Sequence, residues 1–225
     1  MFKKRNFTVL IIGLVLSMTR LFAIESIFEP APIEFLRKAY PDYVFRSSYN
    51  EKFTDWEINI KKGKKEINFF WAEGRLLPED KLGEKARYEK LLYWYPDKAY
   101  DPATFTQKNI EHIKAVTSKE SRKNTNITPP FFFDFIYDSK TQGELEDHIV
   151  GMKFLGFRLN VHERISEPVK KIEAEIKEAA LTDKETADLL KKLDSIGGYN
   201  WRSISDSGSR SFHSLGIAVD VLPKN

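Results

Sequence analysis

The chain has 225 residues, of which 41% are hydrophobic and 31% charged, with a formal net charge of +3. Its 17 phenylalanines, nine tyrosines and four tryptophans exclude an intrinsically disordered protein. The absence of cysteine excludes disulfides, thiolate metal sites, a cysteine nucleophile and a lipid-modified cysteine. The length predicts one domain, or one domain with an added subdomain.

The N-terminus has the three-part layout of a secretory signal. A basic start, Lys3 to Arg5, precedes an apolar run of 12 residues at 7–18 and then the sequence TRLFA. We predict a signal peptide over residues 1–23 and therefore an exported protein of the bacterial periplasm or cell envelope. An uncleaved membrane anchor is the alternative, because Leu21 stands where a small residue is preferred. Removing the segment lowers the formal charge from +3 to −1, so no nucleic-acid partner is expected.

Residues 24–128 are predicted to form an N-terminal subdomain. Apolar residues at helical spacing predict a short helix at 33–40, and a period of two at 56–71, around the loop KKGKK, predicts a β-hairpin. A second helix is expected at 102–116. The polar stretch at 117–130 ends in two prolines, so we place a linker and the domain boundary within it.

Residues 129–225 alternate predicted strands and helices. In chain order these are a strand at 131–138, a helix at 141–152 begun by a Thr141–Glu144 capping box, a strand at 157–161, an amphipathic helix at 165–181, and a helix from a Thr182–Glu185 capping box to about residue 193. The predicted fold class is α+β: a small antiparallel sheet with packed helices, preceded by an N-terminal subdomain with a helix and a β-hairpin.

The sequence SRSFHSLGIAVD at 209–220 carries the candidate chemistry. If GIAVDV is a strand, its three aliphatic residues face one side, while Ala218 and Asp220 face the other. A turn through Gly216 can bring His213 back over that second face, where the small Ala218 leaves room for an imidazole. One nitrogen and one oxygen ligand would then meet at about 2.0–2.2 Å from a zinc ion. The alternative is a histidine hydrogen-bonded to a surface aspartate.

YNWR followed by SRSFHSLGIAVDV resembles the motif region of the zinc-dependent D-alanyl-D-alanine carboxypeptidases, which are related to phage L-alanyl-D-glutamate endopeptidases and the Hedgehog signalling domain. The motif has a serine two residues before a histidine, then a glycine, a small residue and an aspartate. Ser211, His213, Gly216, Ala218 and Asp220 match it. The resemblance is strong over 198–220, looser over 154–176, and does not extend to the N-terminal part.

The resemblance implies zinc as the cofactor and a peptidoglycan stem peptide as the substrate, with D-Ala-D-Ala and L-Ala-D-Glu bonds both open as targets. His213 and Asp220 would be zinc ligands. Arg202 would hold a substrate carboxylate or the developing oxyanion, and Ser211 would contact the substrate.

Members of that family continue past the aspartate to a glutamate, which is the general base, and a second histidine, which is the third ligand. This sequence stops at Asn225, so both roles stay unassigned. We therefore expect residues 129–225 to be a partial peptidase domain that is inactive or impaired alone, unless a separate C-terminal chain complements it. His148, His162 and Glu163 precede the first ligand, the reverse of the family's order, and are not expected to substitute.

The sequence is also compatible with two other functions. A non-catalytic wall-peptide binding module would use Arg202 and no metal. A purely structural envelope protein would bind neither zinc nor peptide.

Overall fold

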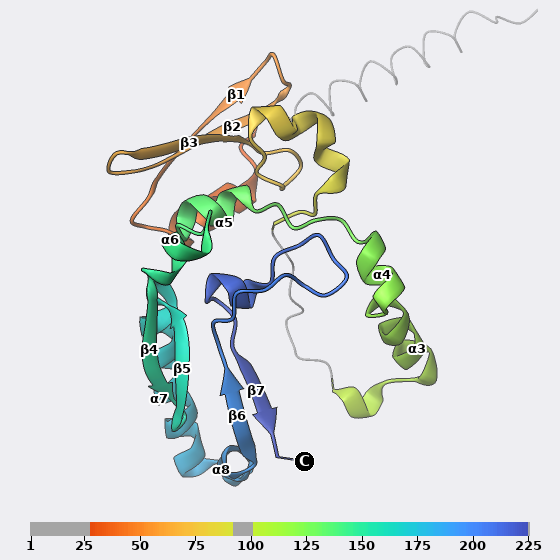
Figure 1. The fold of residues 1–225 in the computed structure, drawn as a ribbon, viewed down its shortest axis with the longest axis vertical. Helices are drawn as coiled ribbons and strands as arrows, with labels where there is room; N and C mark the ends of the chain where they lie inside the picture. The colour runs from red at the N-terminus through yellow and green to blue at the C-terminus, as the bar shows by residue number, and fades with distance from the viewer. Residues whose placement is uncertain (1–27, 92–100, 225) are drawn as a thin grey trace, which may run out of the picture. The chain divides into compact units, whose positions relative to one another are not determined.

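The computed structural model describes residues 28–91 and 101–224, and they divide into two compact units (Figure 1). Unit 1 comprises described residues 28–85 and 90–91, and unit 2 comprises 86–89 and 101–224. The predicted signal peptide lies outside the described residues. Within the part of the chain that the structure describes, no helix has the length and apolar character needed to cross a membrane.

Unit 1 is a three-stranded antiparallel sheet preceded by a helix. Its regular elements are α2 (Ala31–Ala39), β1 (Val44–Asn50), β2 (Asp55–Lys62), β3 (Lys65–Phe70) and the 3-10 segment η1 (Glu79–Arg87). The strand order is β1-β2-β3. The predicted helix and hairpin are confirmed, while β1 was not predicted.

Alternation along the strands produces the core of unit 1. Ile58 pairs with Phe69 and Ile60 with Ile67, and the side chains of Ile58, Ile60 and Phe69 are fully buried. The chain reverses between β2 and β3 at Gly63, whose φ of 58° is a left-handed conformation that glycine adopts without steric cost.

Unit 2 carries the remaining elements. They are η2 (Pro102–Thr104), α3 (Gln107–Val116), α4 (Lys119–Asn124), α5 (Phe131–Ile136), α6 (Gln142–Glu146), β4 (Ile149–Phe154), β5 (Phe157–His162), α7 (Glu163–Thr182), α8 (Lys184–Lys191), β6 (Leu193–Gly197), η3 (Phe212–Leu215) and β7 (Asp220–Pro223).

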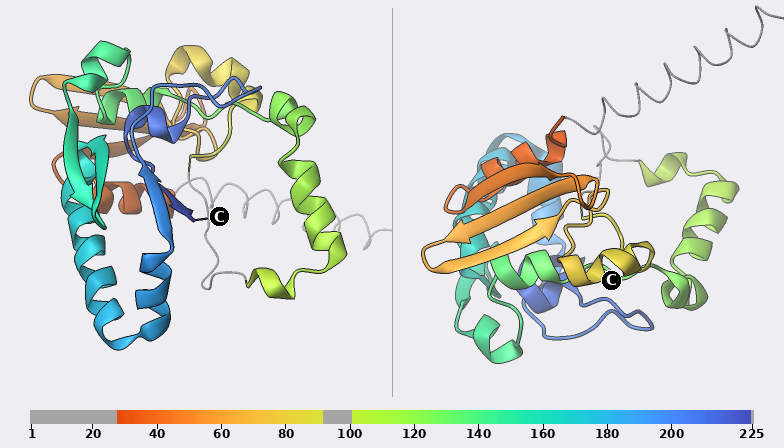
Figure 2. Two further views of the ribbon diagram at one scale, coloured as in Figure 1. Left: turned by 60° about the horizontal axis from the view of Figure 1, so that its bottom comes forward. Right: turned by 90° about the horizontal axis from the view of Figure 1, so that it is seen from above.

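The core of unit 2 lies between α7 and the β4–β5 hairpin. Helix α7 runs along the hairpin, and α8 turns the chain back so that β6 returns beside β5 (Figure 2). The buried cluster contains Phe154, Leu159, Val161 and Val169, with Ile196 and other apolar residues packed against it. The described residues therefore form an α+β protein with small antiparallel sheets, as predicted.

The strand predicted at 131–138 is wrong, because this segment forms helix α5. Pro130 precedes the helix, and proline is well tolerated at a helix start. Phe132 and Ile136 are four residues apart and both buried, at 2% and 1% exposed, which is the spacing of one helix face.

The helix predicted at 141–152 ends early. Its capping box is present, since Thr141 and Glu144 bond reciprocally, but α6 stops at Glu146 and β4 follows. Leu155 and Gly156, with φ of 50° and 91°, form a tight turn that directs the chain from β4 into β5. Strand pairing thus replaces the predicted helix.

Two other boundaries differ from prediction. The N-cap of α8 is Asp183, which accepts hydrogen bonds from the backbone N–H groups of Glu185 and Thr186, so the predicted Thr182–Glu185 box does not form. In the C-terminal motif the strand begins at Asp220 rather than at Ile217.

The two compact units divide near residues 85–90, and the domain boundary at residue 128 stays a prediction. Residues 101–128 belong to unit 2, because Ile127 exchanges backbone hydrogen bonds with Arg87 (2.8 Å) and Glu89 (3.0 Å). The backbone N–H of Thr128 also donates to Ser209 Oγ at 2.9 Å.

Candidate functional site

A single 3-10 turn positions His213. Ser211 is its N-cap, and the Ser211 Oγ accepts a hydrogen bond from the His213 backbone N–H at 3.3 Å. Ser214 Oγ donates to the Ser211 carbonyl at 2.6 Å. The turn ends at Gly216 in the left-handed region, with φ of 68°, as the sequence predicted. The local backbone is therefore well specified around the histidine.

The ring of His213 lies with one nitrogen on the backbone and the other beside Asp220. Nδ1 is 2.7 Å from the Gly198 carbonyl oxygen, which can only accept, so we assign the proton to Nδ1. The other ring nitrogen, Nε2, lies 3.2 Å from Asp220 Oδ2, within hydrogen-bonding distance. The His213 side chain is 13% exposed and that of Asp220 is 55% exposed. The two predicted ligands thus converge at an accessible position.

The geometry of this pair suits a shared cation. Two atoms about 2.1 Å from one zinc ion at a tetrahedral angle lie about 3.4 Å apart, close to the observed separation. A second interaction that fixes the tautomer of a ligating histidine is also usual at such sites. The same separation also fits a direct hydrogen bond from His213 to the Asp220 carboxylate, which is the alternative that the sequence left open.

Two glycines dock the motif against β5. A Cβ on Gly198 would lie 2.2 Å from the Asn160 carbonyl oxygen, and one on Gly216 would lie 2.7 Å from the His162 backbone nitrogen. The neighbouring hydrogen bonds are correspondingly short: Tyr199 N–H to Asn160 O at 2.7 Å and His162 N–H to Gly216 O at 2.8 Å. Strand β5 therefore holds the carbonyl that orients His213.

The two arginines of the 202–210 loop have different surroundings. Arg210 pairs with Asp134, donates to the Ser139 carbonyl, and lies over the Trp201 ring at 5.4 Å. The side chain of Arg202 is exposed and makes no hydrogen bond or ion pair with any described residue. Arg202 is therefore free to bind an anion. The structural role of Arg210 was missed, although its charge and its neighbour Trp201 are visible in the sequence.

Ser211 is 6% exposed, and its hydroxyl already caps the turn. Its contact with substrate remains a prediction.

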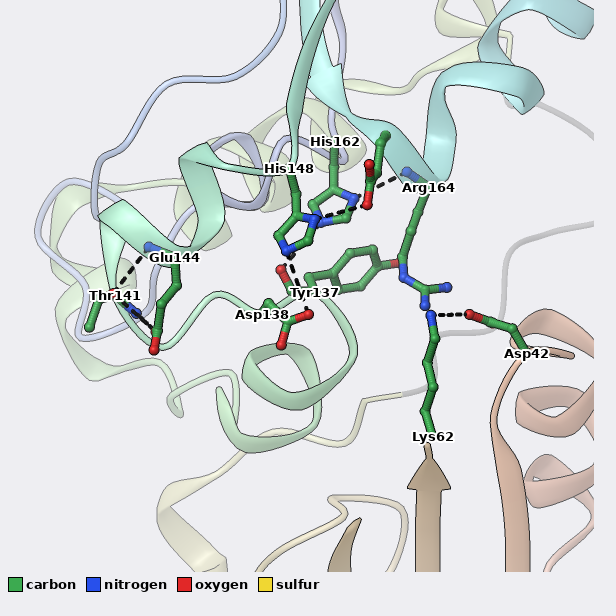
Figure 3. A network of polar contacts seen from close by, with 10 residues as sticks. Asp42, Lys62, Tyr137, Asp138, Thr141, Glu144, His148, His162 and Arg164 are labelled. Atoms are coloured by element: carbon green, nitrogen blue, oxygen red, sulfur yellow. Dashed lines mark hydrogen bonds and ion pairs between the residues drawn. The ribbon is translucent and has the colours of Figure 1, made fainter. Parts of the chain in front are cut away.

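Two histidines, His148 and His162, lie next to each other at the start of α7 (Figure 3). His148 Nδ1 is 2.8 Å from Glu163 Oε1, and its Nε2 is 3.7 Å from Asp138 Oδ2. His162, 2% exposed, stacks on His148 with ring centroids 5.5 Å apart. His148 lies between α6 and β4, His162 ends β5 and Glu163 begins α7, and the sequence did not predict that these side chains meet.

His162 acts as a hydrogen-bonding element of the fold. Its Nδ1 accepts from the Arg164 backbone N–H at 3.1 Å and so caps α7, while its Nε2 lies 3.2 Å from the Tyr137 carbonyl. Burial lowers the pKa of His162, and the nearby His148 acts in the same direction. The neutral ring is thus the form that the fold favours.

Across residues 28–91 and 101–224, no group of three or more His, Cys, Asp or Glu side chains is arranged to hold a metal ion. Among these described residues, His148, His162 and Glu163 do not form such a group with His213 and Asp220.

A protein-family model matches part of the chain. A family described as Domain of unknown function (DUF8518) matches residues 33–93, which include all three strands of unit 1. Searches of curated proteins and of solved structures found no match. The matched segment contains neither His213 nor Asp220.

Proposed function

We propose that unit 2 carries part of a zinc peptidase site of the D-alanyl-D-alanine carboxypeptidase kind, on a Hedgehog-like fold, in an exported protein that acts on peptidoglycan stem peptides. The proposal is supported chiefly by the 3.2 Å approach of His213 Nε2 to Asp220 Oδ2, with Nδ1 held by the Gly198 carbonyl. Residues seven apart in sequence thus present one nitrogen and one oxygen donor to the same point.

Each residue has a defined part in this proposal. His213 supplies a neutral imidazole nitrogen, and Asp220 supplies an anionic oxygen. Bound zinc would polarise the scissile carbonyl and acidify a water molecule. The exposed guanidinium of Arg202, which has no partner among the described residues, would hold a substrate carboxylate or the oxyanion with bidentate hydrogen bonds.

Two parts of a complete site are not found among the described residues. A catalytic zinc usually has three protein ligands, and a positioned base takes the proton from water. We therefore propose that residues 129–224 hydrolyse stem peptides poorly or not at all alone, and that a segment bearing a glutamate and a histidine restores turnover. That segment belongs after Asp220 in the order of the family resembled.

Zinc binding tests the proposal directly. Metal content and competition with a chromophoric chelator are measured on the full chain, on His213→Ala and Asp220→Ala, and on His112→Ala as the control, because His112 is exposed on α3. We expect one zinc per chain, affinity reduced at least about tenfold in each site variant, and no change in the control. Equal zinc affinity in the original chain and His213→Ala would refute the site.

A metal-free peptide-binding function is the second candidate. The observation that favours it is the exposure of Arg202, whose side chain has no partner within residues 28–91 and 101–224. It predicts that an acyl-D-Ala-D-Ala peptide binds equally well with a chelator present, and that Arg202→Ala weakens binding while His213→Ala does not. The zinc proposal predicts that both variants weaken peptide binding.

A further inference from the structure

Unit 1 contains a cavity of about 300 Å³ in the segment matched by the family model. Its lining residues come from the turn between β1 and β2, the start of β2, the chain after β3 and η1. Its charged lining consists of Asp55, Glu73 and Lys85, and its apolar lining includes Phe53 and Leu82. The volume is at the lower end for ligand pockets, which indicates a small ligand.

Asp55 is held in place by the backbone. Its Oδ1 accepts from the Trp56 N–H at 2.8 Å and its Oδ2 from the Ala72 N–H at 2.7 Å. A carboxylate offers about four lone-pair positions, so each oxygen retains capacity for another donor. Asp55 therefore presents a pre-positioned acceptor at the cavity.

Glu73 and Lys85 place opposite charges beside it. Lys85 Nζ is 2.7 Å from Glu73 Oε1, and the side chains are 51% and 58% exposed. Such exposed pairs contribute little to stability, so this pair can open for a ligand at small cost. Burial is the main cause of the raised pKa of Asp55, and its backbone hydrogen bonds and Lys85 offset this only in part.

The backbone at the cavity is strained. Thr54, Ala72 and Glu73 line it with φ of 50°, 47° and 60°, which are uncommon for residues with side chains. Backbone strain of this kind concentrates at ligand sites, where the surrounding structure maintains it.

We propose that this cavity binds a small zwitterion of the α-amino acid type. The ligand's ammonium group contacts Asp55 and Glu73, its carboxylate contacts Lys85, and its side chain packs on Phe53 and Leu82. Arg75 also pairs with Glu73, at 3.3 Å from Nη1 to Oε2, so two carboxylates and two cationic groups lie at or beside the cavity. Charges of both signs match a zwitterion better than a simple anion or a simple cation. The proposal is independent of the proposed zinc site, because none of these residues belongs to unit 2.

Leucine and two analogues test the charge assignment by calorimetry on the full chain. Isoamylamine is leucine without its carboxylate, and isocaproate is leucine without its ammonium group. We expect one leucine enantiomer, or both, to bind at least about tenfold more tightly than either analogue.

Matched lysine variants then locate the site. Lys85→Ala is expected to reduce leucine affinity to that of isoamylamine and to leave isoamylamine binding intact. Lys81→Ala is the control, because Lys81 lies on the same η1 segment, pairs with Asp80 and Glu84, and does not line the cavity. Glu73→Gln is expected to weaken leucine and isoamylamine equally.

Three results would each overturn the proposal: leucine binding no tighter than the analogues, no leucine binding up to about 10 mM, which corresponds to negligible affinity, or equal effects of Lys85→Ala and Lys81→Ala. Circular dichroism confirms that each variant is folded. Zinc binding is measured in the same samples, so a failure of the amino-acid site can be distinguished from a failure of the zinc site.

Discussion

His213 Nε2 lies 3.2 Å from Asp220 Oδ2, although the last two residues of η3, Gly216 and three further residues separate them along the chain. The approach depends on a backbone acceptor at Gly198, which holds the opposite side of the imidazole. The local turn sets the position of His213, and contacts with β5 set its orientation. Perturbing β5 contacts should therefore affect the site without touching either ligand.

Gly198→Ala tests this dependence. The added methyl would lie 2.2 Å from Asn160 O and 2.6 Å from Leu159 Cδ1, so the backbone must move. We expect a loss of about 3 kcal/mol in the free energy of unfolding, measured in urea, and weaker zinc binding. Gly143→Ala is the control, because nothing lies within 4 Å of its added Cβ, and it should lose no stability.

His162 should make stability depend on pH. Its pKa is lowered in the folded protein by burial, against an ordinary value of 6.5, so the unfolded chain binds more protons in the window below 6.5. The stability that it contributes is complete above pH 6.5 and is lost as the pH falls from there through the lowered pKa. Urea unfolding at a series of pH values measures the loss.

His162→Asn is the matched variant for this prediction, because asparagine can still cap α7 by accepting from Arg164 N–H but does not titrate. We expect a smaller fall in stability between pH 7 and pH 5 in the variant. A fall equal to that of the original chain would contradict the assignment of the effect to His162.

The two arginines of the 202–210 loop should differ in their effect on stability. Arg210→Ala removes the pair with Asp134 and the bond to the Ser139 carbonyl, both part-buried, and should cost about 2 kcal/mol. Arg202→Ala removes an exposed side chain without a described partner and should change stability by less than about 0.5 kcal/mol. Thermal unfolding of both variants decides the matter, and equal losses would contradict the assignment.

The N-cap of α8 distinguishes the structure from the sequence pattern. Asp183→Ala removes the acceptor for the N–H groups of Glu185 and Thr186, so it should lower the melting temperature more than Thr182→Ala does. The reverse order would favour the capping box predicted at Thr182.

Secondary structure was predicted best where the hydrophobic residues recur at a regular spacing. The hairpin around Gly63 and the long helix α7 were predicted because alternation and helical spacing continue over many residues. The aromatic run at 131–138 was misread, because a short apolar segment suits a strand or a helix equally until tertiary packing buries Phe132 and Ile136 on one face.

The candidate site was predictable in part for a similar reason. A glycine in a left-handed conformation and an outward aspartate are local features, so the meeting of His213 and Asp220 could be expected from the motif. The Gly198 carbonyl and the Arg210–Asp134 pair involve segments distant in sequence, and no spacing rule indicates them.

The docking of Gly198 and Gly216 on β5 has a consequence during biosynthesis. Until residues beyond 216 have left the ribosome, the edge of β5 that receives them has unpaired backbone groups, and such an edge can pair with another chain. Chains truncated before residue 213 should therefore aggregate as well as lose His213. Low yields of such shortened chains would reflect a strand edge without its backbone partners.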